Sequence, residues 1–224
     1  MVMEFFRGGA DKELEQIEQT IQQMLVDCRH TFDAAINALL GGTEPELVKK
    51  DIKKTDRRVN KAQREVRREL IVHTSVRGAS ADIPMVLVSM SIVKDAERIG
   101  DYAKNIFDLA NAGVDLSSSD LRDQLLTNRD RISRLIAETA RIFGERDAEA
   151  AHEILQTEDE HLSEYDDLVL EQIQSAAPAS EAVPLALLYR YFKRITAHSM
   201  NVLTSLVMPL DRLDYYDEDK ADRW

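Results

Sequence analysis

Residues 95–106 read DAERIGDYAKNI and lie within the most regular part of the sequence. Apolar residues recur around this segment at spacings of three and four: Met85, Ile92, Ala96, Ile99, Ala103, Ile106 and Ala110. Such spacing is typical of an amphipathic α-helix that turns an apolar stripe to the core. A rotation of about 100° per residue places the polar residues of the segment on the opposite side, where we expect them to face solvent. These residues are Glu97, Asp101, Asn105 and Asp108.

Glu97 and Asp101 stand one helical turn apart and carry the same charge. Like charges at this spacing destabilise a helix by about 0.2–0.5 kcal/mol, so the pair needs a counter-charge. Two sources are open at this point. One is a bound cation, and the other is the neighbouring Lys94 and Lys104, which would make the segment an ordinary solvated face.

The segment resembles the signature of the PhoU family, whose members regulate phosphate uptake in bacteria and archaea. In that family the Glu-x-x-x-Asp element, here Glu97 to Asp101, helps to bind iron or zinc clusters on the outside of helical bundles. Residues 56–60 (DRRVN) are similar to a second family element on the preceding helix. Asp56 matches a ligand of that element, whereas Asn60 stands where a second carboxylate is common.

The resemblance therefore implies metal ligands at Asp56, Glu97 and Asp101. Weaker candidates are Asn60, Asn105 and Asp159. Iron or zinc is the cofactor that the family implies, and manganese or magnesium would also suit oxygen ligands. No residue is expected to act as a catalyst.

The composition predicts an all-α protein. Only 8 glycines and 5 prolines occur in 224 residues, and residue types that favour helices dominate. Turn signals at residues 41–42, 78, 113–120, 144 and 176–180 divide the chain into six long helices. We expect a capping box at residues 43–46 and helix N-caps at Asp82 and Asp147.

The two halves of the chain repeat one pattern. With a shift of 96 residues, Ile92, Ala96, Ile99, Ile106 and Ala110 match Leu188, Phe192, Ile195, Val202 and Leu206. The pattern predicts two tandem antiparallel three-helix bundles, at residues 12–115 and 116–210, between an arm at 1–11 and an acidic tail at 211–224. Lys193 and Ala197 replace the carboxylate pair, so the second bundle is expected to lack the site. A similar comparison of the second and fifth helices sets Asp159 opposite Asp56.

The charge and the cysteine content of the chain indicate where in the cell the protein acts. The net charge of −12 disfavours bulk attraction to nucleic acid, and the single cysteine, Cys28, excludes an intrachain disulfide. No apolar run approaches the about 20 residues that a bilayer requires, and no signal sequence is recognisable. We expect a cytoplasmic protein, attached to the inner face of the membrane at most through partners.

Residues 49–69 reverse the acidic average, with ten Lys and Arg against four Asp and Glu. No aromatic residue accompanies these charges, so base stacking is not supported. A solvated or partner-facing helix surface is the favoured interpretation, ahead of nucleic-acid binding.

Enzymatic chemistry finds little support in the remaining residues. Glu149 and His152, and Glu158 and His161, have Glu-x-x-His spacing but fall on a single helix, whereas di-iron bundles draw such pairs from two. Three further histidines have no acidic partner at a recognisable spacing: His30, His73 and His198. No phosphate-binding glycine loop occurs either. The chain is therefore not expected to be an enzyme.

The family resemblance implies a regulator that links a phosphate ABC transporter to a phosphate-sensing histidine kinase. Two alternatives stay open: a PhoU-like accessory domain of another phosphate or cation transporter, and a metal-dependent helical enzyme. A homodimer is also left open.

Overall fold

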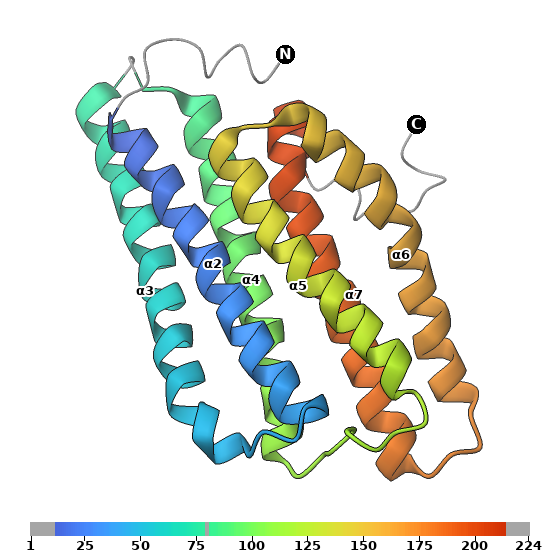
Figure 1. Ribbon diagram of the computed structural model, residues 1–224. Coiled ribbons are helices and arrows are strands. Elements are labelled where there is room, and N and C mark those ends of the chain that lie inside the picture. The colour runs from blue at the N-terminus through green and yellow to red at the C-terminus, as the bar shows by residue number, and fades with distance from the viewer. Residues whose placement is uncertain (1–11, 79–80, 214–224) are drawn as a thin grey trace.

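The computed structural model describes residues 12–78 and 81–213, and it is helical throughout, with no strand in these ranges (Figure 1). The predicted arm at 1–11 and most of the predicted acidic tail, 214–224, lie outside the described residues. Six long helices and one 3-10 turn follow in order: α2 (Lys12–Leu40), α3 (Pro45–Arg77), α4 (Ile83–Asn111), α5 (Arg122–Glu145), α6 (Ala148–Gln174), α7 (Ala179–Val207) and η2 (Leu210–Arg212). No helix in these ranges is long and apolar enough to cross a membrane. The all-α prediction is confirmed.

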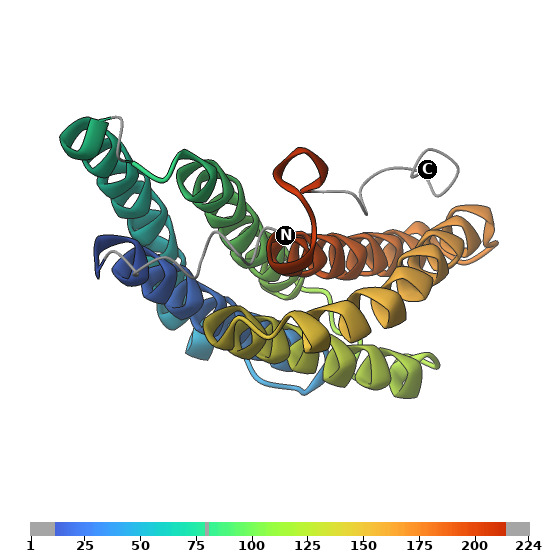
Figure 2. The same ribbon diagram turned by 90° about the horizontal axis from the view of Figure 1, so that it is seen from above.

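The helices form two antiparallel three-helix bundles, as the sequence repeat predicts. Helices α2, α3 and α4 pack on one another, and α7 packs against both α5 and α6. The bundles join where α4 meets α7 and where α2 meets α5. Helices α3 and α6 consequently occupy opposite edges of the molecule (Figures 1 and 2).

Helix starts agree with the sequence in two of three places. The Asp82 carboxylate accepts a hydrogen bond from the Met85 amide at 3.1 Å, and Asp147 does the same for Ala150. The predicted capping box at residues 43–46 is wrong. Glu44 is the N-cap and makes no side-chain cap, because Pro45 occupies the first helical position and its fixed φ starts the helix there.

The hydrophobic core runs without interruption through both bundles. Phe32 on α2 and Phe192 on α7 are both fully buried, and their ring centroids lie 6.2 Å apart. Aromatic pairs at this distance stabilise a core beyond the area they bury. The halves therefore share their interior.

Gly100 lets two helices approach α4 closely. A Cβ atom at this position would lie 3.1 Å from Cys28 Sγ on α2 and 3.7 Å from Val59 Cγ1 on α3. The Cys28 thiol in turn donates to the Ala96 carbonyl at 3.2 Å. The missing side chain at Gly100 therefore serves the packing of α4 against α2 and α3.

Candidate functional site

The predicted ligands lie where α3 packs against α4, but they are less exposed than expected. Glu97 is buried, with 9% of its surface exposed, and Asp56 and Asp101 are half-buried. The prediction that Glu97 faces solvent is wrong, because α2, α3 and α7 all pack on α4 and cover more of it than one apolar stripe. Asp108, farther along the helix, is exposed as expected.

Each of the three carboxylates contacts a basic side chain. Lys94 Nζ lies 2.6 Å from Glu97 Oε2, and Arg98 Nη1 lies 3.6 Å from Asp101 Oδ2, both within α4. The third contact crosses between helices. Lys104 Nζ on α4 lies 3.5 Å from Asp56 Oδ1 on α3. Both counter-charges considered from the sequence, Lys94 and Lys104, are therefore used.

The basic side chains do not restore the pKa of Asp101 to its ordinary value. The pKa of Asp101 is raised above its ordinary value, first by burial and next by the charge of Glu97, with a smaller contribution from Asp56. Arg98 and Lys94 oppose this rise without reversing it. The charges of Glu97 and Asp56 thus both act on Asp101.

The carboxylates do not converge as they stand. Across residues 12–78 and 81–213, no three His, Cys, Asp or Glu side chains come close enough together to hold a metal ion. Asn60 and Asn105 are half-buried on α3 and α4, on the same two helices as the carboxylates. Asp159 lies on α6, at the opposite edge of the molecule.

The corresponding place in the second bundle holds an internal ion pair. Lys193 on α7 contacts Asp166 on α6, and Ala197 is buried. An ammonium group has no lone pair to offer a metal, and the ammonium group of Lys193 already contacts the Asp166 carboxylate. The two bundles therefore differ in charge at equivalent positions.

A polar network that the sequence analysis missed joins the bundles between α4 and α7. Asp95 Oδ1 accepts hydrogen bonds from His198 Nδ1 at 2.8 Å and from Asn201 Nδ2 at 3.2 Å. Arg194 Nη2 lies 3.2 Å from His198 Nε2, and the Tyr102 ring stacks on the imidazole with centroids 5.7 Å apart. The contacts of Asp95 and Tyr102 join α4 to α7 and so connect the two bundles. The contact between Arg194 and His198 lies within α7, beside them.

The network assigns one tautomer to His198. A guanidinium has only donors, so Nε2 must accept from Arg194, and the ring proton must sit on Nδ1, where it is donated to Asp95. The sequence shows no acidic partner for His198 at a recognisable spacing, and the structure supplies one from another helix. Asp95 is 103 positions away in the sequence, too far for any local spacing to reveal.

The other two histidines also have acidic partners on different helices. His30 Nε2 lies 2.5 Å from Asp51 Oδ2 at the surface, and His73 Nδ1 lies 3.0 Å from Glu13 Oε2. These contacts connect α2 with α3 and contain no nucleophile. They therefore add acidic partners that no sequence spacing reveals, without suggesting catalysis.

Comparison with known proteins shows which family and which solved structures this chain resembles. Residues 21–110 match the PhoU domain family. The structure resembles PhoU from Pseudomonas aeruginosa with a TM-score of 0.73 and 22% identity, over 90% of this chain and 98% of that one. It resembles the phosphate transport system regulatory protein PhoU from Streptococcus pneumoniae with a TM-score of 0.75 and 21% identity, over 90% and 96%. No curated protein sequence matches the chain.

Proposed function

Because residues 21–110 match the PhoU domain family, we propose that this protein is a regulator of phosphate transport rather than an enzyme. The observation that carries the proposal is the extent of the likeness. The chain has the fold of the phosphate transport system regulatory protein of Streptococcus pneumoniae over 96% of that protein's length, with both bundles included. We propose that the protein acts in the cytoplasm. The partners we propose for it there are a phosphate ABC transporter and a phosphate-sensing histidine kinase.

Complementation tests this role directly. A bacterial strain that lacks its own PhoU is given this chain, and the uptake of radiolabelled phosphate is measured in phosphate-rich medium. We expect uptake to fall relative to the empty vector. Unchanged phosphate uptake together with altered uptake of another ion would instead favour the accessory domain of a different transporter.

We further propose that Asp56, Glu97 and Asp101 bind a cation, with Asn60 and Asn105 as flanking oxygen donors. Support comes from the raised pKa of Asp101, to which burial contributes most and to which the nearby charges of Glu97 and Asp56 add. An all-oxygen set suits magnesium, manganese or iron better than zinc, which favours nitrogen and sulfur. Lys94 and Lys104 are flexible side chains and would swing aside to release their carboxylates.

Metal content and thermal stability provide the test. Protein prepared without chelator, and after reconstitution with iron, manganese, magnesium and zinc in turn, is analysed for bound metal. We expect Glu97→Gln with Asp101→Asn to abolish binding, and Asp108→Asn, on the exposed face of α4, to preserve it. A wild-type protein that stays metal-free and gains no thermal stability with any ion would refute the site while leaving the regulatory role intact.

A further inference from the structure

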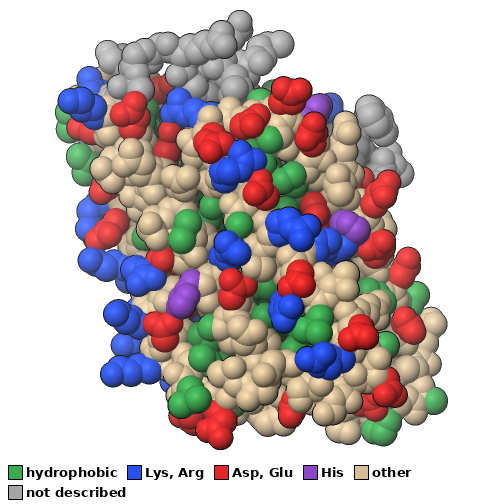
Figure 3. Space-filling model, viewed as in Figure 1, with side chains coloured by type: hydrophobic (Ala, Val, Ile, Leu, Met, Phe, Trp, Pro, Cys, Tyr) green, Lys and Arg blue, Asp and Glu red, His purple; other side chains and the backbone are tan. Residues whose placement is uncertain are grey.

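Helix α3 carries a long basic stripe on its outer face. Its members recur at alternating spacings of four and three, and every one is exposed: Lys50, Lys54, Arg57, Lys61, Arg64 and Arg68. At 100° per residue they fall within an arc of about 80° and extend over about 27 Å of helix. Lys and Arg side chains accordingly gather along the edge of the molecule formed by α3 (Figure 3).

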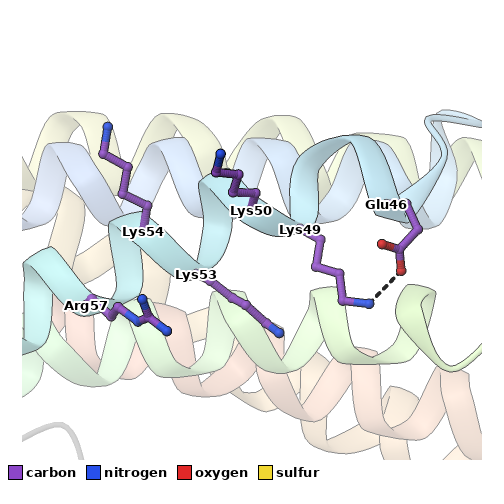
Figure 4. Close-up of a pocket in the computed structure, with 6 residues that line it drawn as sticks. All are labelled: Glu46, Lys49, Lys50, Lys53, Lys54 and Arg57. Carbon is purple, nitrogen blue, oxygen red and sulfur yellow. Dashed lines mark hydrogen bonds and ion pairs between the residues drawn. The ribbon is translucent and has the colours of Figure 1, made fainter.

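These cations are arranged for an extended partner. Near the start of α3, Lys50 and Lys54 project on one side of the helix and Lys49 and Lys53 on the other (Figure 4). The surface lined by these side chains therefore spreads positive charge rather than focusing it on a small anion. Among the described residues, Lys61 is the only member of the stripe in an ion pair, a surface contact with Glu65 at 3.2 Å.

Helix α6, at the opposite edge, carries the complementary stripe. It contains nine Asp and Glu and no Lys or Arg. Five exposed carboxylates follow the same spacing, interrupted once by Thr157: Glu153, Glu160, Glu164, Asp167 and Glu171. They occupy an arc of about 60° and the same length of about 27 Å. Only Glu164 among them forms ion pairs within the described chain, with Arg131 and His161.

The two stripes match residue by residue when the helices are set antiparallel. Lys54 then lies opposite Asp167, and Lys61 lies opposite Glu160. The remaining pairs are Lys50 with Glu171, Arg57 with Glu164, Arg64 with Thr157 and Arg68 with Glu153. In the molecule α3 and α6 run in opposite directions (Figure 1), so two copies placed side by side in the same orientation set these helices antiparallel, as this register requires.

We propose that α3 of one copy binds α6 of a second copy of this chain. The contact joins different surfaces of the two partners, so it is heterologous and propagates into open chains or closes into a ring. Complementary charge supplies orientation and register, against the general repulsion of a molecule with a net charge of −12.

Charge exchange tests the register. Sedimentation velocity is recorded over a range of protein concentrations at low salt and at about 1 M salt, where the Debye length is only about 3 Å. We expect the wild-type protein to form larger species at low salt and to be monomeric at high salt. Lys54→Glu with Lys61→Glu should weaken association by on the order of tenfold or more, and Glu160→Lys with Asp167→Lys should do the same.

Combining both pairs of substitutions in one chain provides the decisive result. Each pair alone sets like charges against each other, whereas a chain with Lys54→Glu, Lys61→Glu, Glu160→Lys and Asp167→Lys restores opposite charges at both changed positions, so its self-association should return. Arg122→Glu with Arg134→Glu, which makes the same change in net charge on exposed positions of α5, should leave association unchanged. A chain that carries Lys54→Glu and Lys61→Glu together with Glu153→Lys and Glu171→Lys, which are out of register, should stay monomeric.

Three outcomes would overturn the proposal. The wild-type protein could stay monomeric at every low-salt concentration, the chain with all four charge-exchanging substitutions could fail to associate, or the α5 control could match the α3 variant. A monomeric protein that binds vesicles of anionic lipid, or duplex DNA, and loses that binding with Lys54→Glu and Lys61→Glu would assign the basic stripe to that partner instead.

Discussion

At the scale of single residues, the candidate site is a place where carboxylates are held near one another against their mutual repulsion. Glu97 and Asp101 are one turn apart and partly removed from water, and each retains a basic neighbour. Burial and the neighbouring carboxylates nevertheless raise the pKa of Asp101. The folded protein is therefore destabilised by the ionised form of this side chain, in a way that depends on pH.

Asp101→Asn should raise the melting temperature of the metal-free protein at neutral pH. A raised pKa means that the folded state binds the proton more tightly than the unfolded state, so the ionised carboxyl reduces stability above its folded pKa. The destabilisation fades as the pH falls through that value toward the ordinary 3.8. The gain from Asp101→Asn should fade with it, as differential scanning calorimetry in chelator at several pH values would show.

Asp108→Asn is the matched control, because Asp108 lies on the same helix and is exposed. It should leave the melting temperature unchanged at every pH. A lower melting temperature for Asp101→Asn at neutral pH would mean that the contact with Arg98 outweighs repulsion from Glu97 and the cost of burial.

At the scale of helices, α4 can pack close to α2 because Gly100 has no side chain at their contact. Gly100 costs about 1 kcal/mol of helix propensity relative to alanine, and it is tolerated because Cys28 fills the space beside it. Burial also raises the pKa of the Cys28 thiol, so its environment suits packing rather than nucleophilic chemistry.

Gly100→Ala should destabilise the wild-type protein by about 1 kcal/mol, because overpacking near Cys28 outweighs the gain in helix propensity. In a Cys28→Ala background the same substitution should be neutral or stabilising by up to about 1 kcal/mol, since the new methyl group meets no sulfur. Urea denaturation of the four proteins gives the coupling energy. Equal effects of Gly100→Ala in both backgrounds would contradict this account.

At the scale of the whole molecule, the two bundles behave as one body because they share their core and their polar contacts. Phe32 and Phe192 meet across the halves, and Asp95 accepts hydrogen bonds from His198 and Asn201 of the other bundle. On the other side of the joint, Gln22 Nε2 donates to the Ala140 carbonyl at 3.0 Å. Separate halves would expose these groups.

Phe32→Ala should therefore weaken both bundles together, by about 3–5 kcal/mol, although the residue belongs to the first. Native-state hydrogen exchange should show faster exchange in the amides of α3 and of α6 to the same extent. Leu47→Ala, at a position with 74% exposure, should change stability by no more than about 0.5 kcal/mol. Faster exchange confined to the first bundle would show that the halves unfold separately.

The sequence by itself determined the helices and their order. Apolar spacing around residues 95–106, the glycine and proline punctuation and the caps at Asp82 and Asp147 are local signals, and each acts within a few residues of where it stands. The same local spacing explains why the basic helix and the carboxylate pair could be recognised before the fold was known. The internal repeat then predicted two bundles, because each copy must bury the same stripe.

Only the tertiary structure decided which sides of these helices are covered. Glu97 is buried because α4 has neighbours on several sides, and a single helix carries no record of how many helices will pack on it. The partners of His198 and Asp95, 103 positions apart, and the opposite placement of the α3 and α6 stripes depend on the same long-range packing. Local periodicity encodes an apolar face, whereas the contacts between distant segments follow from how all the faces are buried at once.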